Sequence, residues 1–227
     1  MVKIFPLSLI IFLTTVCVSC SDREQATNNV TKEVSKNVTD NVSQVKNILF
    51  FGNSLTAGYG LDPTESFPSL IQAKIDSMHL PYKTINAGVS GETSAGGNGR
   101  INWILKQPFD VFVLELGAND GLRGVPVAET KKNLQAIIDK VKAKYPQAKL
   151  VLAGMEVPPN MGQEYSAAFH NLFPDLAAKN NMELIPFLLE GVGGVRELNQ
   201  QDGIHPTAEG EKIVTENIWK ILKEILE

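Results

Sequence analysis

The chain has 227 residues, 43% of them hydrophobic and 20% charged, and its formal net charge is −4. This length suits one domain with a sizeable core and is short for two. The 21 basic residues are outnumbered by 25 acidic ones and form no cluster, which argues against a protein that binds nucleic acid.

The N-terminal residues have the pattern of an export signal. Met1–Lys3 carries one positive charge, and Ile4–Val18 is almost entirely apolar but short for a membrane span. Ser19-Cys20 resembles the end of a bacterial lipobox, whose cysteine is lipidated, although Cys17 stands where leucine is usual. We predict a signal peptide over 1–20, lipidation of Cys20, and export from a bacterial cytoplasm as a periplasmic or outer-membrane/cell-envelope lipoprotein. An ordinary cleaved signal and a retained anchor are the alternatives.

Residues 21–45 differ in composition from the rest of the chain. They are rich in Asn, Thr, Ser, Val, Lys and Glu and contain no glycine, proline or aromatic residue, which predicts a disordered tether. Valines at positions 30, 34, 38 and 42 leave a short amphipathic helix as the alternative, although Asn and Thr disfavour it. The folded domain is predicted over 46–227. Both cysteines precede it, so it offers no thiolate nucleophile or cysteine-ligated zinc site.

From Lys46 onward, short apolar runs alternate with segments of helical periodicity. The predicted strands are Asn47–Phe51, Tyr82–Asn86, Val111–Leu116, Lys149–Ala153 and Glu183–Ile185. The predicted helices are Ser66–Met78, Asn102–Lys106, Thr130–Tyr145, Tyr165–Asn181 and Thr207–Leu226. The run at Val111–Leu116 is apolar nearly throughout, which is typical of a strand buried on both faces. This alternation predicts an α/β fold, with helices on both faces of a parallel sheet.

Polar and glycine-rich segments follow each predicted strand. In chain order they are Gly52–Ser54, Asn86–Thr93, Gly117–Asp120, Val157–Asn160 and, after a longer loop, Asp202–His205. The carboxyl ends of parallel strands share one edge of a sheet, where ligands bind. We therefore expect these segments to converge on one site.

A serine and a histidine among these segments suggest nucleophilic chemistry. A serine hydroxyl attacks well only when a base takes its proton, so Ser54 requires a partner. His205 is the histidine placed in a loop, whereas His79 and His170 lie in predicted helical segments and are more typical of surface or satisfied residues. Asp202 can accept the other imidazole N–H and fix its tautomer if the segment turns like the start of a helix.

Acyl transfer also needs hydrogen-bond donors for the oxyanion. The backbone N–H groups of Ser54 and Gly91 and the side-chain amide of Asn119 are the candidates. Each motif alone is more typical of a structural turn, and Asn119-Asp120-Gly121 is an excellent turn sequence. Their occurrence together after successive strands favours a catalytic site.

Four segments resemble those of the SGNH hydrolases, the GDSL-like lipase and esterase superfamily. They are Gly52–Gly60, Asn86–Ser94, Glu115–Gly124 and Asp202–Thr207. Glu115–Gly124 and Pro159–Gly162 resemble in particular the secreted bacterial arylesterase, acyl-CoA thioesterase I and lysophospholipase subgroup. The resemblance covers residues 46–227.

This resemblance implies a flavodoxin-like three-layer α/β/α sandwich around a five-stranded parallel sheet. It implies Ser54 as nucleophile, His205 as general base and acid, and Asp202 as the orienting carboxylate. The oxyanion hole would be formed by the Ser54 and Gly91 N–H groups and Asn119. The implied reaction is hydrolysis of carboxylic esters or thioesters through an acyl-serine, with no cofactor or metal. The loop 120–125 corresponds to one that moves when an acyl chain binds.

The expected partner is a small acyl ester or thioester, and contact with a membrane is expected only through the lipid anchor. Apolar residues that could line its pocket are Leu122, Val125, Val157, Met161, Phe187, Leu188 and Leu189. Two alternatives stay open: a carbohydrate acetylesterase of the same fold, and a noncatalytic envelope lipoprotein that binds acyl ligands.

One position departs from the superfamily's pattern. The residue before the serine is usually aspartate and is Asn53 here. Asparagine keeps the size and one acceptor of aspartate but lacks the charge. We expect weaker electrostatic support of the turn, with the nucleophile still in place.

Overall fold

The computed structural model describes residues 45–227. The predicted signal peptide, Cys20 and all but the last residue of the predicted tether lie outside the described residues, and these interpretations stay predictions.

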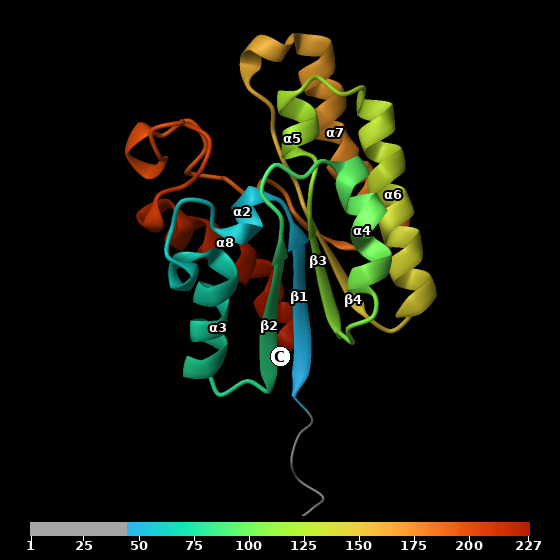
Figure 1. Ribbon diagram of the computed structural model, residues 1–227, viewed down its shortest axis with the longest axis vertical. Helices are drawn as coiled ribbons and strands as arrows, with labels where there is room; N and C mark the ends of the chain where they lie inside the picture. The colour runs from blue at the N-terminus through green and yellow to red at the C-terminus, as the bar shows by residue number, and fades with distance from the viewer. Residues whose placement is uncertain (1–44) are drawn as a thin grey trace, which may run out of the picture. The chain divides into compact units, whose positions relative to one another are not determined.

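A five-stranded parallel sheet forms the centre of the domain, in the order β2-β1-β3-β4-β5 (Figure 1). The strands are β1 Lys46–Gly52, β2 Tyr82–Gly88, β3 Val111–Glu115, β4 Lys149–Ala153 and β5 Glu183–Ile185. This is the flavodoxin-like order, so the predicted fold is confirmed. Gly52 pairs with Gly88 on one side and Glu115 on the other, so the segments that follow these three strands begin side by side.

Helices cover both faces of the sheet (Figure 1). The α-helices are α2 Ser54–Ala57, α3 Phe67–Ser77, α4 Ser94–Ile104, α5 Ala118–Leu122, α6 Val127–Lys144, α7 Gln163–Asn180 and α8 Ala208–Leu226. Short 3₁₀ turns occur at η1 Pro63–Glu65, η2 Pro159–Met161 and η3 Arg196–Leu198. Helices α3 and α8 lie on one face, and α4, α6 and α7 lie on the other. Among residues 45–227, no helix combines the length and apolar character that a membrane span requires.

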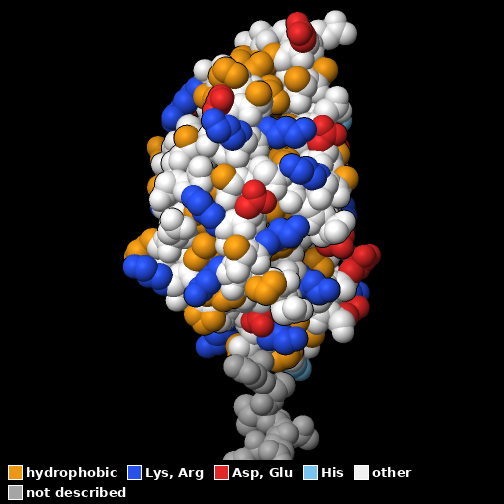
Figure 2. Space-filling model, turned by 90° about the vertical axis from the view of Figure 1, so that its right-hand side faces the viewer, with side chains coloured by type: hydrophobic (Ala, Val, Ile, Leu, Met, Phe, Trp, Pro, Cys, Tyr) orange, Lys and Arg blue, Asp and Glu red, His pale blue; other side chains and the backbone are white. Residues whose placement is uncertain are grey.

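Hydrophobic periodicity explains how the layers hold together. Every residue of β3 is buried, because helices cover this central strand on both faces. Helix α6 buries an apolar stripe, comprising Leu134, Ile137, Ile138 and Val141. On the face of the domain shown in Figure 2, Lys and Arg side chains lie dispersed among acidic and apolar ones.

Helix α4 is longer than predicted and begins at Ser94 instead of Asn102. Its first turns contain Gly96, Gly97 and Gly99. Glycine has a low helix propensity, so the sequence did not predict a helix over these turns. The Thr93 side chain caps the helix by accepting from the Gly96 N–H at 3.3 Å. Gly97 is buried against Leu116 and Phe51, so a glycine is needed for the helix to approach the sheet closely.

Helix α5 forms over Ala118–Leu122, where the Asn-Asp-Gly sequence is typical of a turn. Asp120 is buried there and forms hydrogen bonds with the first residue of α4. Its carboxylate accepts from the N–H and the hydroxyl of Ser94 at 2.7 and 2.5 Å. This long-range contact, which a local turn motif does not reveal, fixes the helix against the start of α4.

We expect Gly97→Ala to destabilise the fold by roughly 1–3 kcal/mol, because the new methyl group would overlap the buried Leu116 side chain. Gly99→Ala in the same helix is the matched control. Apart from the neighbouring residues and backbone of its own helix, no atom lies within 4 Å of a Cβ built there, so helix propensity should stabilise this variant by about 1 kcal/mol. Urea unfolding of both variants measures the difference, and equal destabilisation would contradict the packing argument.

Candidate active site

The nucleophile candidate Ser54 is the first residue of α2, directly after β1 and Asn53. The side-chain oxygen of Asn53 accepts from the Leu55 N–H at 2.9 Å and caps this short helix. The turn places Ser54 at the carboxyl edge of the sheet, between the segments that follow β2 and β3. Ser54 is 7% exposed, so little of it is open to solvent.

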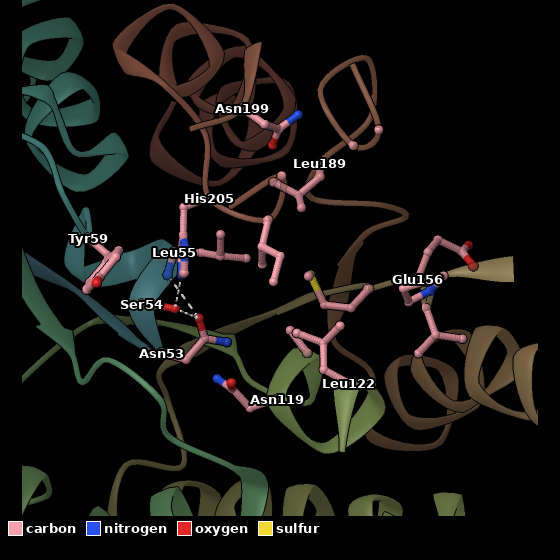
Figure 3. Close-up of a pocket in the computed structure, with 18 of the residues that line it drawn as sticks. Asn53, Ser54, Leu55, Tyr59, Asn119, Leu122, Glu156, Leu189, Asn199 and His205 are labelled. Carbon is pink, nitrogen blue, oxygen red and sulfur yellow. Dashed lines mark hydrogen bonds between the residues drawn. The ribbon is translucent and has the colours of Figure 1, made fainter. Parts of the chain in front are cut away.

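The loop before α8 brings His205 and Asp202 to Ser54, and Figure 3 shows His205 beside Ser54. Ser54 Oγ lies 2.8 Å from His205 Nε2, and His205 Nδ1 lies 2.6 Å from Asp202 Oδ2. A longer contact of 3.4 Å joins Ser54 Oγ to Asn53 Oδ1. The three residues therefore form one continuous series of contacts, from elements about 150 residues apart in the chain.

The environment of Asp202 determines which nitrogen of His205 carries the proton. The hydrogen bond from the His205 side chain, followed by the backbone N–H groups of His205 and Ile204, lowers the pKa of Asp202 to about 2. An ionised carboxylate can only accept, so Nδ1 of His205 donates and Nε2 accepts from the Ser54 hydroxyl.

The Asp202–His205 contact differs in one respect from expectation. The segment does not turn as the start of a helix, because α8 begins later, at Ala208, with Thr207 as its cap. Asp202 Oδ1 accepts from the N–H groups of Ile204 and His205 at 2.9 and 3.0 Å, and this turn brings the two side chains together.

Tyr59 and Gln200 link the segment that carries Ser54, residues 52–57 (the nucleophile turn), to the loop that carries His205. The sequence did not reveal this link. The Tyr59 ring lies 4.6 Å from the His205 ring between centroids. Gln200 Nε2 donates to the backbone oxygens of Tyr59 at 2.7 Å and Pro206 at 2.9 Å. These contacts hold the imidazole against the nucleophile turn.

Gly91 and Asn119 line the same pocket as Ser54, and in Figure 3 Asn119 lies on the other side of Ser54 from His205. Gly91 has a φ of +77°, which favours glycine, and its carbonyl accepts from Arg123 Nη2 at 3.0 Å. Asn119 Nδ2 donates one N–H to the Glu92 carbonyl at 3.0 Å, which leaves the other N–H for a ligand. The structure thus brings all the predicted oxyanion donors to one pocket.

Arg100 organises the loop that carries Gly91, and sequence reasoning missed it. Its guanidinium forms an ion pair with Glu92 at 2.6 Å and donates to the carbonyls of Ala87 and Gly52. The same group lies 4.0 Å from the centroid of the Phe51 ring. The opposite charges of Glu92 and Arg100, eight residues apart, are the sequence signal that could have indicated this ion pair.

A cavity of about 670 Å³ opens beside Ser54. Most of its surface is apolar, and the apolar side chains that line it are Leu55, Ala118, Leu122, Met155, Val157, Pro158, Phe187, Leu189 and Ile204. Ser54, His205 and Asn119 lie at one end in Figure 3, and Glu156 lies at the opposite end. The cavity suits an apolar chain attached to a reactive group at the Ser54 end.

The structure places the predicted pocket residues in different positions. Leu122 and Val157 line the cavity, as do Phe187 and Leu189. Leu188 is buried in the core. Val125 and Met161 do not line it: the Val125 carbonyl instead accepts from the Tyr165 hydroxyl at 2.7 Å, and Met161 belongs to the η2 turn. Loop geometry decides these positions, and single apolar residues do not reveal it.

The other histidines do not line the cavity beside Ser54. His79 follows α3 with a φ of +54°, and His170 on α7 is paired with Glu156 at 2.5 Å. Within residues 45–227, no three side chains of the metal-ligating types gather in one place.

Comparisons with known proteins agree with this geometry. Residues 50–213 match the GDSL-like Lipase/Acylhydrolase family. The chain is 39% identical to Esterase TesA of Pseudomonas aeruginosa over 79% of this chain and 89% of the relative. It is 36% identical to an arylesterase of Vibrio mimicus, over 74% and 84% of the two chains. It is 35% identical to Thioesterase 1/protease 1/lysophospholipase L1 of Escherichia coli K12, over 79% and 84%.

Solved structures give the same picture. The crystal structure of TesA superposes with a TM-score of 0.76 at 39% identity, over 80% of this chain and all of that one. The psychrotrophic esterase EstA from Pseudoalteromonas sp., in a structure inhibited by monoethylphosphonate, superposes with a TM-score of 0.75 at 35% identity, over 80% and 98%.

Proposed function

Since this chain belongs to the GDSL-like lipase/acylhydrolase family and is a carboxylic ester hydrolase, we propose that Ser54 is its nucleophile, His205 its proton shuttle and Asp202 its orienting carboxylate. The reaction is hydrolysis of an ester or thioester through an acyl-serine intermediate. The supporting observation is the series of contacts from Ser54 to His205 at 2.8 Å and from His205 to Asp202 at 2.6 Å.

In the acylation step, Ser54 Oγ attacks the substrate carbonyl carbon while its proton passes to His205 Nε2. The bond from the carbonyl carbon to the leaving oxygen or sulfur then breaks. The same proton passes from Nε2 to that atom and completes an alcohol or thiol. Asp202 stays ionised and stabilises the imidazolium that exists between these transfers.

Deacylation repeats these steps with water. His205 Nε2 takes a proton from water, the hydroxide attacks the acyl-serine, and the proton returns to Ser54 Oγ as the acid leaves. In both steps, the carbonyl oxygen becomes negative. We propose that the N–H groups of Ser54 and Gly91 and the amide of Asn119 stabilise this charge, as their position around one pocket supports.

The cavity is better suited to bind the acyl chain of a substrate than a polar group. Its mostly apolar lining matches a hydrocarbon chain better than a sugar ring, which needs many polar partners. We therefore place esters and thioesters of aliphatic acids before acetylated carbohydrates.

Covalent labelling tests the proposal directly. A fluorophosphonate probe should react with the native protein, and peptide mass analysis should find the adduct on Ser54. Ser90 lines the same pocket and makes no hydrogen bond with His205 among the described residues, so it should stay unmodified. An unlabelled folded protein, or an adduct only at another residue, would contradict the assignment.

We also propose export with lipidation of Cys20, on the strength of the N-terminal sequence alone. Mass analysis of the N-terminal peptide from membranes of a bacterial expression host should find an acylated Cys20. In a Cys20→Ala variant, the protein should leave the membrane fraction. An unmodified Cys20 in the membrane protein would contradict this proposal.

A further inference from the structure

Glu115 is a carboxylate buried beneath the nucleophile turn. It ends β3, is 1% exposed, and pairs in register with Gly52, two residues before Ser54. Its oxygens accept from the Asn53 side-chain amide at 2.7 Å, the Asn53 backbone N–H at 3.0 Å and the Thr56 hydroxyl at 2.8 Å. These donors belong to the turn and helix that carry Ser54.

The site has room for this carboxylate only because residue 52 is glycine. A Cβ at Gly52 would overlap the Thr56 hydroxyl and lie 2.5 Å from Glu115 Oε2. The carboxylate thus contacts both ends of the turn.

Each oxygen of Glu115 has a distinct set of partners. Oε2 accepts from the Asn53 backbone and from Thr56, and Oε1 accepts from Asn53 Nδ2. Oδ1 of Asn53 faces the other way and caps Leu55. The orientation of the Asn53 amide is therefore determined: its nitrogen must face Glu115 and its oxygen must face the helix.

The charges around Glu115 do not include a paired cation among the described residues. Glu211 on α8 is the nearby carboxylate, and it accepts from the Phe67 N–H at 3.0 Å. Arg100 reaches the Gly52 carbonyl but is paired with Glu92. Burial raises the pKa of Glu115 to about 7, against the lowering effect of its hydrogen bonds, and raises that of Glu211 to about 8.

We propose that Glu115 is a positioning residue for Ser54, and that Asn53 supplies the donor which lets the Glu115 contact persist without a bound proton. This inference rests on the proposed role of Ser54. Ionisation of Glu115 leaves the Asn53 donors in place and makes their bonds charge-assisted. The turn therefore keeps its geometry as the pH rises.

An aspartate at position 53 would behave differently. Two carboxyl oxygens would then lie at the place of the present 2.7 Å contact, and they could bond only by sharing a proton. The pKa of that shared proton would be raised above its value in the unfolded chain. The contact would be complete at low pH and lost as the pH rises through the raised pKa.

The test exchanges donor and acceptor across this contact. Asn53→Asp should match the wild type in kcat near pH 6 and fall at least tenfold below it by pH 10.

Glu115→Gln should lower kcat by about 10-fold to 100-fold at every pH, because an amide N–H then faces another donor. The double variant should recover kcat at every pH, since the introduced glutamine can donate to the introduced aspartate while its oxygen accepts from the backbone and Thr56. KM for p-nitrophenyl butyrate should change little throughout.

Glu211→Gln is the matched control. It removes the neighbouring buried carboxylate, which accepts a hydrogen bond from the first residue of α3 and makes none with Asn53 among the described residues. It should change the pH dependence of thermal unfolding and leave the pH profile of kcat unaltered. An alkaline limb in Asn53→Asp equal to that of the wild type, or a double variant no better than Glu115→Gln, would overturn the proposal.

The same variants in a Ser54→Ala background separate this inference from the proposed function. Recovery of thermal stability in the double variant can be measured there without catalysis. If stability recovers there but kcat does not recover in the active background, Glu115 is structural and not a positioning residue. If the labelling of Ser54 fails while the stability coupling persists, the proposed nucleophile is wrong and the Asn53–Glu115 contact stands.

Discussion

Ser54→Ala is expected to lower kcat for p-nitrophenyl butyrate by about 10⁶-fold, because the acyl-enzyme can no longer form. The hydroxyl removed is the one that lies 2.8 Å from His205 Nε2. The oxyanion donors all remain, since the substitution leaves the backbone N–H of residue 54 in place beside the Gly91 N–H and the Asn119 amide. They would still polarise a bound ester, so activity should stay measurable above the uncatalysed rate. Steady-state kinetics on highly purified protein measure the loss, and a burst of p-nitrophenol should disappear with it.

Ser90→Ala is the matched control for this experiment. Ser90 lines the same pocket and carries the same hydroxyl, and no hydrogen bond joins it to His205 within residues 45–227. We expect less than about a tenfold change in kcat for this variant, since removing one exposed hydroxyl leaves the acyl-enzyme route intact. A folded Ser54→Ala protein with kcat within about 100-fold of the wild type would refute covalent catalysis at Ser54.

The second large effect is expected from Asp202→Asn, which should lower kcat by about 10⁴-fold. The introduced asparagine can keep one oxygen on the N–H groups of Ile204 and His205, and its amide nitrogen then faces His205 Nδ1. That donor forces the ring proton onto Nε2, which can no longer accept from Ser54. The nucleophile is then present but has no base.

Two measurements distinguish this tautomer effect from misfolding. Nitrogen NMR of the His205 ring should show the proton on Nδ1 in the wild type and on Nε2 in the variant. His170→Ala removes a second carboxylate–histidine contact, at Glu156, and should leave kcat nearly unchanged. Retention of the Nδ1 proton in Asp202→Asn with full activity would contradict the assigned role.

The loss of activity on the acid side of the pH profile should not result from protonation of Asp202. Its hydrogen bonds lower its pKa from 3.8 to about 2, so it stays ionised through the range in which the activity is measured. Any stability that this low pKa contributes is present above about pH 4 and lost as the pH falls toward 2.

Much of the site was predictable because its signals are local. Apolar runs marked all the strands of the sheet, and the order of polar segments after them placed Ser54, Gly91 and Asn119 at one edge. The helix at Ser94–Ile104 was mostly missed because its glycines serve packing against Leu116 rather than helix propensity. The apolar candidates Val125 and Met161 lie outside the cavity lining because loop geometry decides which side chains face it.

The amino-acid pattern alone determined the layered α/β architecture and the candidate chemistry, since hydrophobic periodicity and turn motifs act over a few residues. The tautomer of His205 and the orientation of the Asn53 amide depend instead on contacts that only the folded chain makes. The orientation of the Asn53 amide is imposed by Glu115, which is 62 residues away in the chain. Burial raises the pKa of Glu115 and hydrogen bonds lower it, so both determine its charge. Burial and partner geometry are tertiary quantities, so no local pattern around Asn53 could reveal why an amide suits that position.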